Sequence, residues 1–269
     1  MGRLFVVSTP IGNLEDVSLR ALRVLGEVSL IAAEDTRVTR KLLSKYDIHT
    51  RLIPYHKHNK GYQTARIVDA LGRGDVALVS DAGTPVLSDP GQELIRAAIG
   101  LGFDVVAVPG PSAITHALTV SGLEAEPFLF EGFLPALGRD RRARLSALAE
   151  VQATLVLFEA PHRVRGTLNE LAAAFGGSRK VAVCRELTKL HEQVIRTTLA
   201  EAPDQVPERG EFTLVVDGAP PPLPPELDSA SERLRTLLAA GATRKDAATQ
   251  VSAELGLPHR QVYKLVLGL

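Results

Sequence analysis

The chain has 269 residues, of which 45% are hydrophobic, and its 31 Lys and Arg residues balance its 31 Asp and Glu residues. This length allows one large domain or two modest ones, with enough apolar residues for a full core. The balanced charge excludes a globally basic field, so a nucleic-acid partner would have to be bound by local basic patches. The single cysteine excludes a disulfide framework and a cysteine-based zinc site, and it favours a reducing, cytoplasmic setting.

The sequence supports neither a membrane segment nor a metal site. No apolar run approaches transmembrane length, and residues 1–7 are typical of a first strand rather than of a signal peptide. His56 and His58 have no obvious third ligand, so we interpret 56–59 as a polar loop. We therefore predict a cytoplasmic protein with no membrane association and no metal.

The first half of the chain alternates short apolar strands with helices. Asp35 or Thr36 is expected to cap the second helix. This alternation predicts a mostly parallel sheet in an α/β domain over residues 1–122. Strands are expected at 4–8, 30–33, 52–55, 76–79 and 105–108, and helices at 17–25, 38–46, 63–71, 92–101 and up to residue 120.

The stretch 76–91 breaks from an apolar run into a loop of small residues. Gly83 lets the backbone approach a ligand closely and Asp81 adds an acceptor, at the sheet edge where open α/β folds bind ligands. Asp89 and Pro90 are expected to cap and begin the next helix. The alternative is an ordinary turn, because Gly, Asp and Pro are turn residues in any case.

Two further loops follow strands in the same way, at 9–13 and at 109–113. In the second, Pro111 suits the first helical turn and Ser112 is placed to hold the polar end of a ligand. G-x-G-x-x-G, P-loop and G-x-S-x-G motifs are all missing, so dinucleotide, P-loop nucleotide and hydrolase sites have no support.

The second half has fewer helices between its strands, which predicts a mixed sheet in a second α/β domain over 123–218. Residues 124–135, with three phenylalanines, are interpreted as an irregular crossing between the domains. Four arginines within 139–144 open a helix and indicate either a solvated face or a phosphate-contacting patch. Strands are expected at 154–158, 180–184, 193–199 and 212–216, with a helix ending at 175.

A proline-rich linker over 219–227 precedes a helical module over 228–269. Helices are expected at 229–240, 243–254 and 259–267, the last two at helix-turn-helix spacing. The module is interpreted as a surface for nucleic acid, a surface for a partner, or a cap on the fold. Its basic residues favour the first: Arg244, Lys245, His259, Arg260 and Lys264.

Six motifs follow one another in an order that is typical of one enzyme family. They are STPIGNL at 8–14, AEDTR at 33–37, SDAGTP at 80–85, VPGPSA at 108–113, FEAPHR at 158–163 and RELTK at 185–189. Together they resemble the ribosomal RNA small subunit methyltransferase I family, within the tetrapyrrole-methylase-like superfamily of S-adenosylmethionine (SAM) enzymes. The C-terminal module resembles the helix-turn-helix tail of the same family. The first and third motifs lack the G-x-G-P-G-D and G-D-P patterns of porphyrin and corrin enzymes, which favours the RNA branch.

The resemblance implies two α/β domains of the tetrapyrrole-methylase type with SAM in the cleft between them, in a homodimer. It implies methylation of the ribose 2′-hydroxyl of a decoding-centre cytidine in 16S rRNA, either as RNA or in the small ribosomal subunit. By motif position it implies SAM contacts from Pro10, Asp81, Gly83, Thr84, Pro85, Val86, Ser112, Ala113, Phe133, Phe158, Glu159, Ala160, Cys184 and Arg185.

A ribose hydroxyl is a poor nucleophile, so a positioned base is expected to assist its attack. The candidates at strand ends are Glu34, Asp35, His56, Glu159, His162, Glu186 and Lys189. We hypothesise that Glu159 or Glu186 is the base, with Lys189 in the catalytic set. The cations expected to hold RNA phosphates are Arg37, Arg141, Arg142, Arg144, Arg163, Arg185 and Lys189. For each of these residues, a salt bridge between the domains is the alternative.

Two other functions fit the same residues less well. One is a SAM methyltransferase of this fold that acts on a small tetrapyrrole-like molecule, which the tail and the arginine cluster disfavour. The other is a ribosome-binding protein without catalysis, which would not require small-residue loops at three strand ends.

Overall fold

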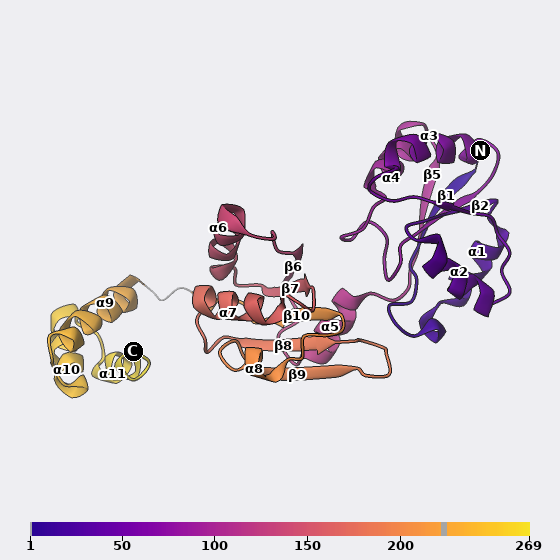
Figure 1. Ribbon diagram of the computed structural model, residues 1–269. Coiled ribbons are helices and arrows are strands. Elements are labelled where there is room, and N and C mark those ends of the chain that lie inside the picture. The colour runs from indigo at the N-terminus through magenta and orange to yellow at the C-terminus, as the bar shows by residue number, and fades with distance from the viewer. Residues whose placement is uncertain (1, 222–224) are drawn as a thin grey trace. The chain divides into compact units, whose positions relative to one another are not determined.

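The protein is described here by a computed structural model, which covers residues 2–221 and 225–269, with side chains from residue 227 onward in the second range. These residues divide into two compact units, Met1–Ala219 and Pro220–Leu269 (Figure 1). No helix in the described ranges is both long and apolar enough to cross a membrane.

The first sheet is wholly parallel, in the order β3-β2-β4-β1-β5. Its elements are β1 (Arg3–Val7), α1 (Leu19–Glu27), β2 (Leu30–Ala33), α2 (Thr36–Lys45), β3 (Leu52–Pro54), α3 (Lys60–Leu71), β4 (Val76–Val79), α4 (Gln92–Gly100) and β5 (Asp104–Val108). A short 3-10 helix, η1 (Leu14–Asp16), follows β1. The parallel sheet predicted for the first half is confirmed.

Strand β4 shows why these strands are apolar throughout. Val76 and Leu78 pack against α3 and α4, whereas Ala77 and Val79 pack against α1 and α2. Successive side chains of a strand point to opposite faces, and both faces here are covered by helices (Figure 1). Because both faces are buried, polar side chains follow β4 only after the strand has ended, in the loop that begins at Ser80.

Three helix starts test the predicted caps. Asp35 caps α2 as expected, since its side chain accepts a hydrogen bond from the backbone N–H of Arg37. The helix predicted over 92–101 begins at Gln92 as expected, but the predicted cap at Asp89 and first helical residue at Pro90 are wrong, because the N-cap is Gly91 with a φ of 142°. The next helix, α5 (Ala113–Ser121), begins after Ser112, so Pro111 also lies outside it.

The second sheet is mixed, as predicted, in the order β6-β7-β10-β8-β9. Strand β6 is parallel to β7, and the other pairs are antiparallel. Its elements are β6 (Phe128–Phe133), α6 (Gly138–Ala149), β7 (Thr154–Glu159), α7 (Val164–Phe175), β8 (Lys180–Arg185), β9 (Gln193–Thr198), α8 (Ala202–Gln205) and β10 (Phe212–Val216).

The interpretation of 124–135 as an irregular crossing is wrong, because β6 is an edge strand of this sheet. Its pairing with β7 shifts register between Phe130 and Gly132, and Gly132 has a φ of 72°. A bulge of this kind breaks the alternation by which a strand is recognised in sequence. One face of the sheet packs on α6, α7 and α8, and the other face packs on α5.

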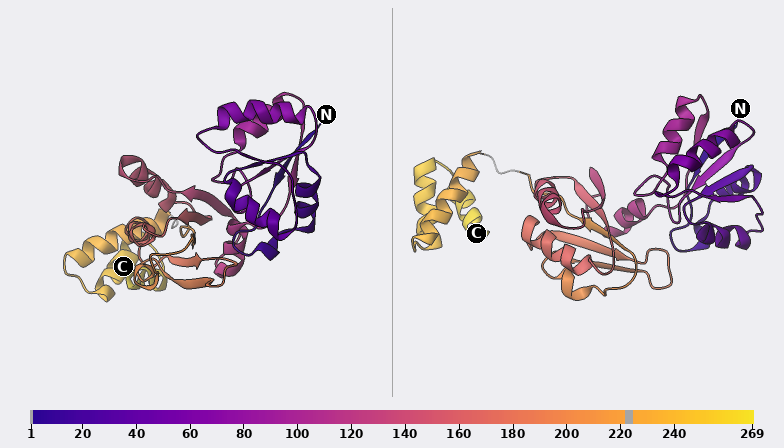
Figure 2. Two further views of the ribbon diagram at one scale, coloured as in Figure 1. Left: turned by 45° about the vertical axis from the view of Figure 1, so that its right-hand side comes forward. Right: turned by 45° about the horizontal axis from the view of Figure 1, so that its top comes forward.

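The C-terminal module has three helices: α9 (Pro225–Ala239), α10 (Arg244–Leu255) and α11 (His259–Leu267). Figure 2 shows the three helices against one another. Their own core includes Leu234 of α9, Val251 of α10, and Val262 and Val266 of α11. The predicted helices are confirmed, and the linker prediction falls partly on 222–224, which lie outside the described residues.

Candidate functional site

A cavity of about 450 Å³ opens where the strand ends of both sheets meet. The first sheet contributes loops that follow β1, β2, β4 and β5. The second contributes the ends of β6, β7 and β8 and the start of the antiparallel β10. The lining residues are Ile11, Glu34, Asp81, Ala82, Gly83, Thr84, Leu87, Ser88, Asp89, Ser112, Ala113, Ile114, Phe133, Phe158, Glu159, Ala160, Pro161, Cys184, Leu187, Glu211, Phe212 and Thr213.

Most residues that the motifs assign to a cofactor line this one cavity. Ten of the fourteen do so, from Asp81 in the first sheet to Cys184 in the second. The exceptions are Pro10, Pro85, Val86 and Arg185. The Arg185 Nε instead donates to the carbonyl of Arg209 at 2.7 Å. The cofactor role of each residue stays a prediction.

The loop between β4 and α4 carries backbone strain beside the cavity. Val86 and Ser88 have φ values of 80° and 70°, in the left-handed region that L-residues rarely adopt. Gly83, with a φ of 77°, exchanges two backbone hydrogen bonds with Thr9, of 2.9 and 3.0 Å. At the far end of the loop, Ser88 reaches β6, where its Oγ would lie 3.0 Å from a Cβ added to Gly132. Strain of this kind persists only where surrounding contacts hold it.

Three carboxyl groups gather on the side of the cavity that the first sheet forms. Burial raises the pKa of Glu34, and the nearby carboxylates of Asp89 and Asp81 raise it further. Burial is also the main cause of the raised pKa of Asp81 and of Asp89. The Asp81 Oδ1 accepts a hydrogen bond from the backbone N–H of Asp35 at 2.8 Å. The site therefore concentrates negative charge that a cationic ligand would relieve.

Aromatic rings form an apolar wall on the side of the second sheet. The Phe158 ring meets the rings of Phe130 and Phe133 edge to face, with centroids 5.0 and 5.7 Å apart. Phe133 is 53% exposed although it is a large apolar residue. A ligand with both a cationic and an apolar part would be matched by this cavity.

Comparisons with known proteins agree with these features. The family model described as tetrapyrrole (corrin/porphyrin) methylases matches residues 3–203. The ribosomal RNA small subunit methyltransferase I of Synechocystis sp. is 46% identical over 275 residues, which cover 100% of this chain and 99% of that protein. The chain belongs to the ribosomal RNA small subunit methyltransferase I family of tetrapyrrole methylases. The enzyme of the same name from Halalkalibacterium halodurans is 45% identical, over 98% of this chain and 94% of that protein.

Solved structures share the fold. A uroporphyrin-III C-methyltransferase of Thermus thermophilus superposes with a TM-score of 0.60 at 24% identity, over 81% of this chain and 94% of that one. A structure of a Thermus thermophilus uroporphyrin-III C-methyltransferase complexed with S-adenosylhomocysteine has a TM-score of 0.59 at 22% identity, over 80% of this chain and 97% of that one. The resemblance of the six motifs to this family, and the predicted tetrapyrrole-methylase fold, are therefore confirmed.

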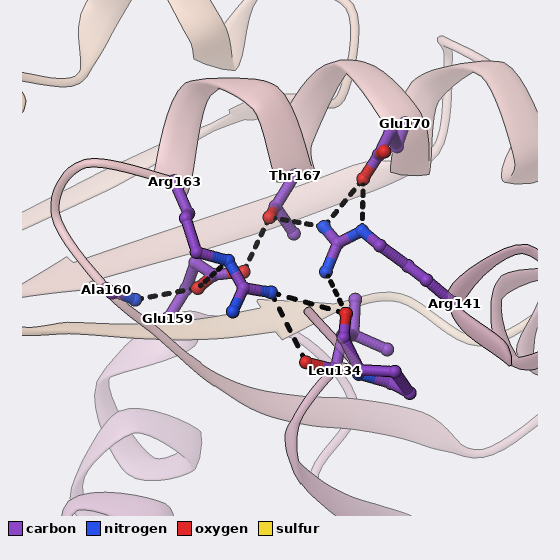
Figure 3. A network of polar contacts seen from close by, with 8 residues as sticks. Leu134, Arg141, Glu159, Ala160, Arg163, Thr167 and Glu170 are labelled. Carbon is purple, nitrogen blue, oxygen red and sulfur yellow. Dashed lines mark hydrogen bonds and ion pairs between the residues drawn. The ribbon is translucent and has the colours of Figure 1, made fainter. Parts of the chain in front are cut away.

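In this family member Glu159 belongs to a polar network under α7 (Figure 3). Its side chain is 1% exposed and accepts from the Ala160 N–H at 2.7 Å and from the Thr167 hydroxyl at 2.5 Å. The Arg163 Nε lies 3.4 Å from the Glu159 Oε1. Glu159 borders the cavity, but these three donors already occupy its oxygens, which argues against its predicted role as a base.

Arg141 completes the network from α6 and is 5% exposed. Its guanidinium donates to the Glu170 carboxylate, the Pro135 carbonyl and the Thr167 hydroxyl, at 2.7, 2.9 and 2.7 Å (Figure 3). This burial and these bonds argue against the predicted contact of Arg141 with RNA, which stays a prediction. Helical spacing alone did not reveal which of the four arginines points inward.

The other predicted RNA-binding arginines differ in their exposure and in whether they already form ion pairs or hydrogen bonds. Arg142 is exposed. Arg144 pairs with Glu131, and Arg163 donates to the Leu134 carbonyl as well as facing Glu159. Arg37 is 83% exposed, although it pairs with Asp35. Their contact with RNA stays a prediction, which Arg142 and Arg37 fit best.

Glu186 and Lys189 form an ion-pair cluster with Glu211. The Lys189 Nζ lies 2.9 Å from the Glu186 Oε1 and 3.0 Å from the Glu211 Oε2. Burial works to raise the pKa of Glu186, but the Glu211 N–H and the Lys189 ammonium outweigh it and hold that pKa below its ordinary value. Although burial opposes it, bonding to both glutamates raises the pKa of Lys189, so it stays a cation. Neither side chain is suited to accept a proton.

Sequence reasoning missed several lining residues. The sequence indicates Asp89 only as a helix cap and gives no signal for Leu87, Ser88 or Glu211, all of which line the cavity. The signal for Asp89 was its position within the same loop as Asp81. Glu211 had no such signal, because it reaches the cavity from the start of an antiparallel strand.

Proposed function

We propose that the protein transfers a methyl group from SAM to the ribose 2′-hydroxyl of a decoding-centre cytidine in 16S rRNA. The observation that carries the proposal is the cavity that joins the motif loops of both sheets in one site. Family membership supports the reaction class, and the names of the relatives support a small-subunit rRNA substrate. The predicted homodimer belongs to the proposal and is measured by light scattering.

The residues present fit SAM as a ligand. The cavity volume lies within the range of about 300–1,000 Å³ that is usual for small-molecule sites. The carboxyl groups of Glu34, Asp81 and Asp89 suit a cation, and Phe133 and Phe158 offer apolar surface. When bound, SAM supplies an electrophilic methyl group on a sulfonium, so no metal is required for transfer.

Glu34 is the residue that we propose as proton acceptor for the ribose hydroxyl. It lines the cavity, and its raised pKa brings it closer to the working pH that favours a general base. Glu159 and Glu186 are less suited, because each is held by several donors. Lys189 stays a cation and pairs with Glu211, which lines the cavity, so we propose that it holds an RNA phosphate nearby.

Asp81→Ala is expected to weaken SAM binding by about tenfold or more, because a hydrogen bond to a charged group contributes about 1.5–3 kcal/mol. Calorimetric titration of the purified protein with SAM measures the change. Asp69→Ala is the matched control, since Asp69 is an exposed aspartate of α3 that pairs with Arg73, outside the cavity lining. Equal SAM affinity in both variants would remove Asp81 from the site, and no binding by the unmodified protein would overturn the proposal.

Gly12→Ala is expected to weaken SAM binding and slow methyl transfer. A Cβ at Gly12 would lie 2.5 Å from the Lys189 Cγ and 2.9 Å from the Leu187 carbonyl oxygen, so one cavity wall must move. A displacement of about 1 Å can reduce a rate by about 10²-fold. Single-turnover transfer with and without saturating SAM separates the two effects.

Gly26→Ala is the control for this change. A Cβ at Gly26, within α1, meets no atom within 4 Å, and alanine favours a helix. If both variants transfer methyl groups at the unmodified rate, the contact between the two loops does not shape the site.

A further inference from the structure

The last helix of the chain presents polar and basic side chains on one face. His259, Arg260, Tyr263 and Lys264 are exposed, whereas Val262 and Val266 pack into the core of the module. The spacing i, i+1, i+4, i+5 places the four exposed residues side by side on an α-helix. This set is called the α11 face below.

The α11 face has no acidic residue within its helix, although the module as a whole carries both signs. On α10, the carboxylate of Glu254 pairs with Arg233 of α9. Asp246 accepts a hydrogen bond from the Thr243 hydroxyl at the start of α10. These two acids of α10 are thus engaged away from the α11 face, and its cations have no ion pair among the described residues.

An aromatic pair also lies on this face. The rings of His259 and Tyr263 are stacked, with centroids 5.9 Å apart and planes at 20°. A His259 ring nitrogen lies 3.3 Å from the Thr249 hydroxyl of α10, which holds the ring across the helix-turn-helix. Proteins that bind nucleic acids commonly combine exposed aromatic rings, which stack on bases, with cations, which contact phosphates.

We infer that the α11 face binds the sugar-phosphate backbone of RNA and gives the protein a second RNA contact besides the methyl-transfer cavity. Arg260 and Lys264 contact phosphates, and the His259–Tyr263 pair lies against the adjoining sugar or base. That the nucleic acid is RNA rests on the proposed function. The face itself is argued from charge, exposure and the ring pair.

The test measures binding of a fluorescein-labelled RNA hairpin to the full chain by anisotropy, without SAM, over a range of salt concentrations. Arg260→Gln and Lys264→Gln are each expected to lower the slope of log K against log salt by about one. Near 0.1 M salt this corresponds to about an eightfold loss of affinity per contact. The double variant is expected to lose both contributions, with SAM affinity unchanged.

Arg235→Gln is the matched control, because Arg235 is exposed on α9 and its loss changes the net charge equally. Equal losses in Arg235→Gln and the α11 variants would reduce the effect to net charge and overturn the inference. Unchanged RNA affinity in the double variant would also overturn the inference. The α11 face would then be a candidate surface for a protein partner instead. If the α11 variants lose RNA affinity but the unmodified protein methylates no RNA, the proposed function fails and the inference stands.

Discussion

Glu34→Gln is expected to slow single-turnover methyl transfer by about 10²–10⁴-fold, the range that general-base catalysis contributes. The substitution keeps the size of the side chain but removes the proton acceptor. In the unmodified protein the rate should rise with pH through the raised pKa of Glu34, because only the carboxylate accepts a proton. The variant should lose this rise, which stopped-flow or quench measurements across the acid range detect.

Glu211→Gln is the comparison variant for the assignment of Glu34 as proton acceptor. Glu211 also lines the cavity, but its side chain is 74% exposed and lies beside Lys189. If Glu211→Gln abolishes the pH-dependent rise and Glu34→Gln does not, the proton acceptor is Glu211.

The same Glu34→Gln variant has an expected effect on stability with a definite sign. Because the pKa of Glu34 is raised in the folded state, the folded protein binds more protons than the unfolded chain above about pH 4.5, the ordinary value. The stability of the unmodified protein therefore falls as pH rises from that value through the raised pKa. The variant should gain Tm relative to the unmodified protein across this window, and the gain should vanish below it.

Arg141→Ala is expected to lower the free energy of unfolding by about 1–3 kcal/mol, because buried polar groups would lose their hydrogen-bond donor. The change would leave the Thr167 hydroxyl and the Pro135 carbonyl without the donors they now have. Urea denaturation measures the loss. RNA affinity, corrected for the folded fraction, should not change.

Arg142→Ala is the control from the adjacent position. Its side chain is exposed, so its unfolding free energy should stay within about 0.5 kcal/mol of that of the unmodified protein. Equal stability of the two variants would mean that the network under α7 contributes little to folding.

Local sequence patterns predicted most of the helices and strands. They failed where a glycine with positive φ interrupts the regular pattern of a strand or precedes a helix. The continuous apolar run of β4 is read correctly because both faces of the strand are buried. Strand β6 was missed because Gly132 introduces a shift in register, and the alternation of a strand is lost there. The cap of α4 is misassigned to Asp89 and Pro90, because Gly91 with a φ of 142° is the N-cap.

The sequence by itself determined the family, the order of the elements and the loops that line the cavity. These follow from short-range patterns: apolar periodicity, small residues after a strand, and six motifs in order. Only the tertiary structure decided the role of individual charges. Arg141 is held by Glu170, which lies 29 positions away, and the pKa of Glu34 is raised by burial and by Asp89 and Asp81 of another loop. Such burial and charged neighbours come from distant segments, so sequence spacing does not contain them.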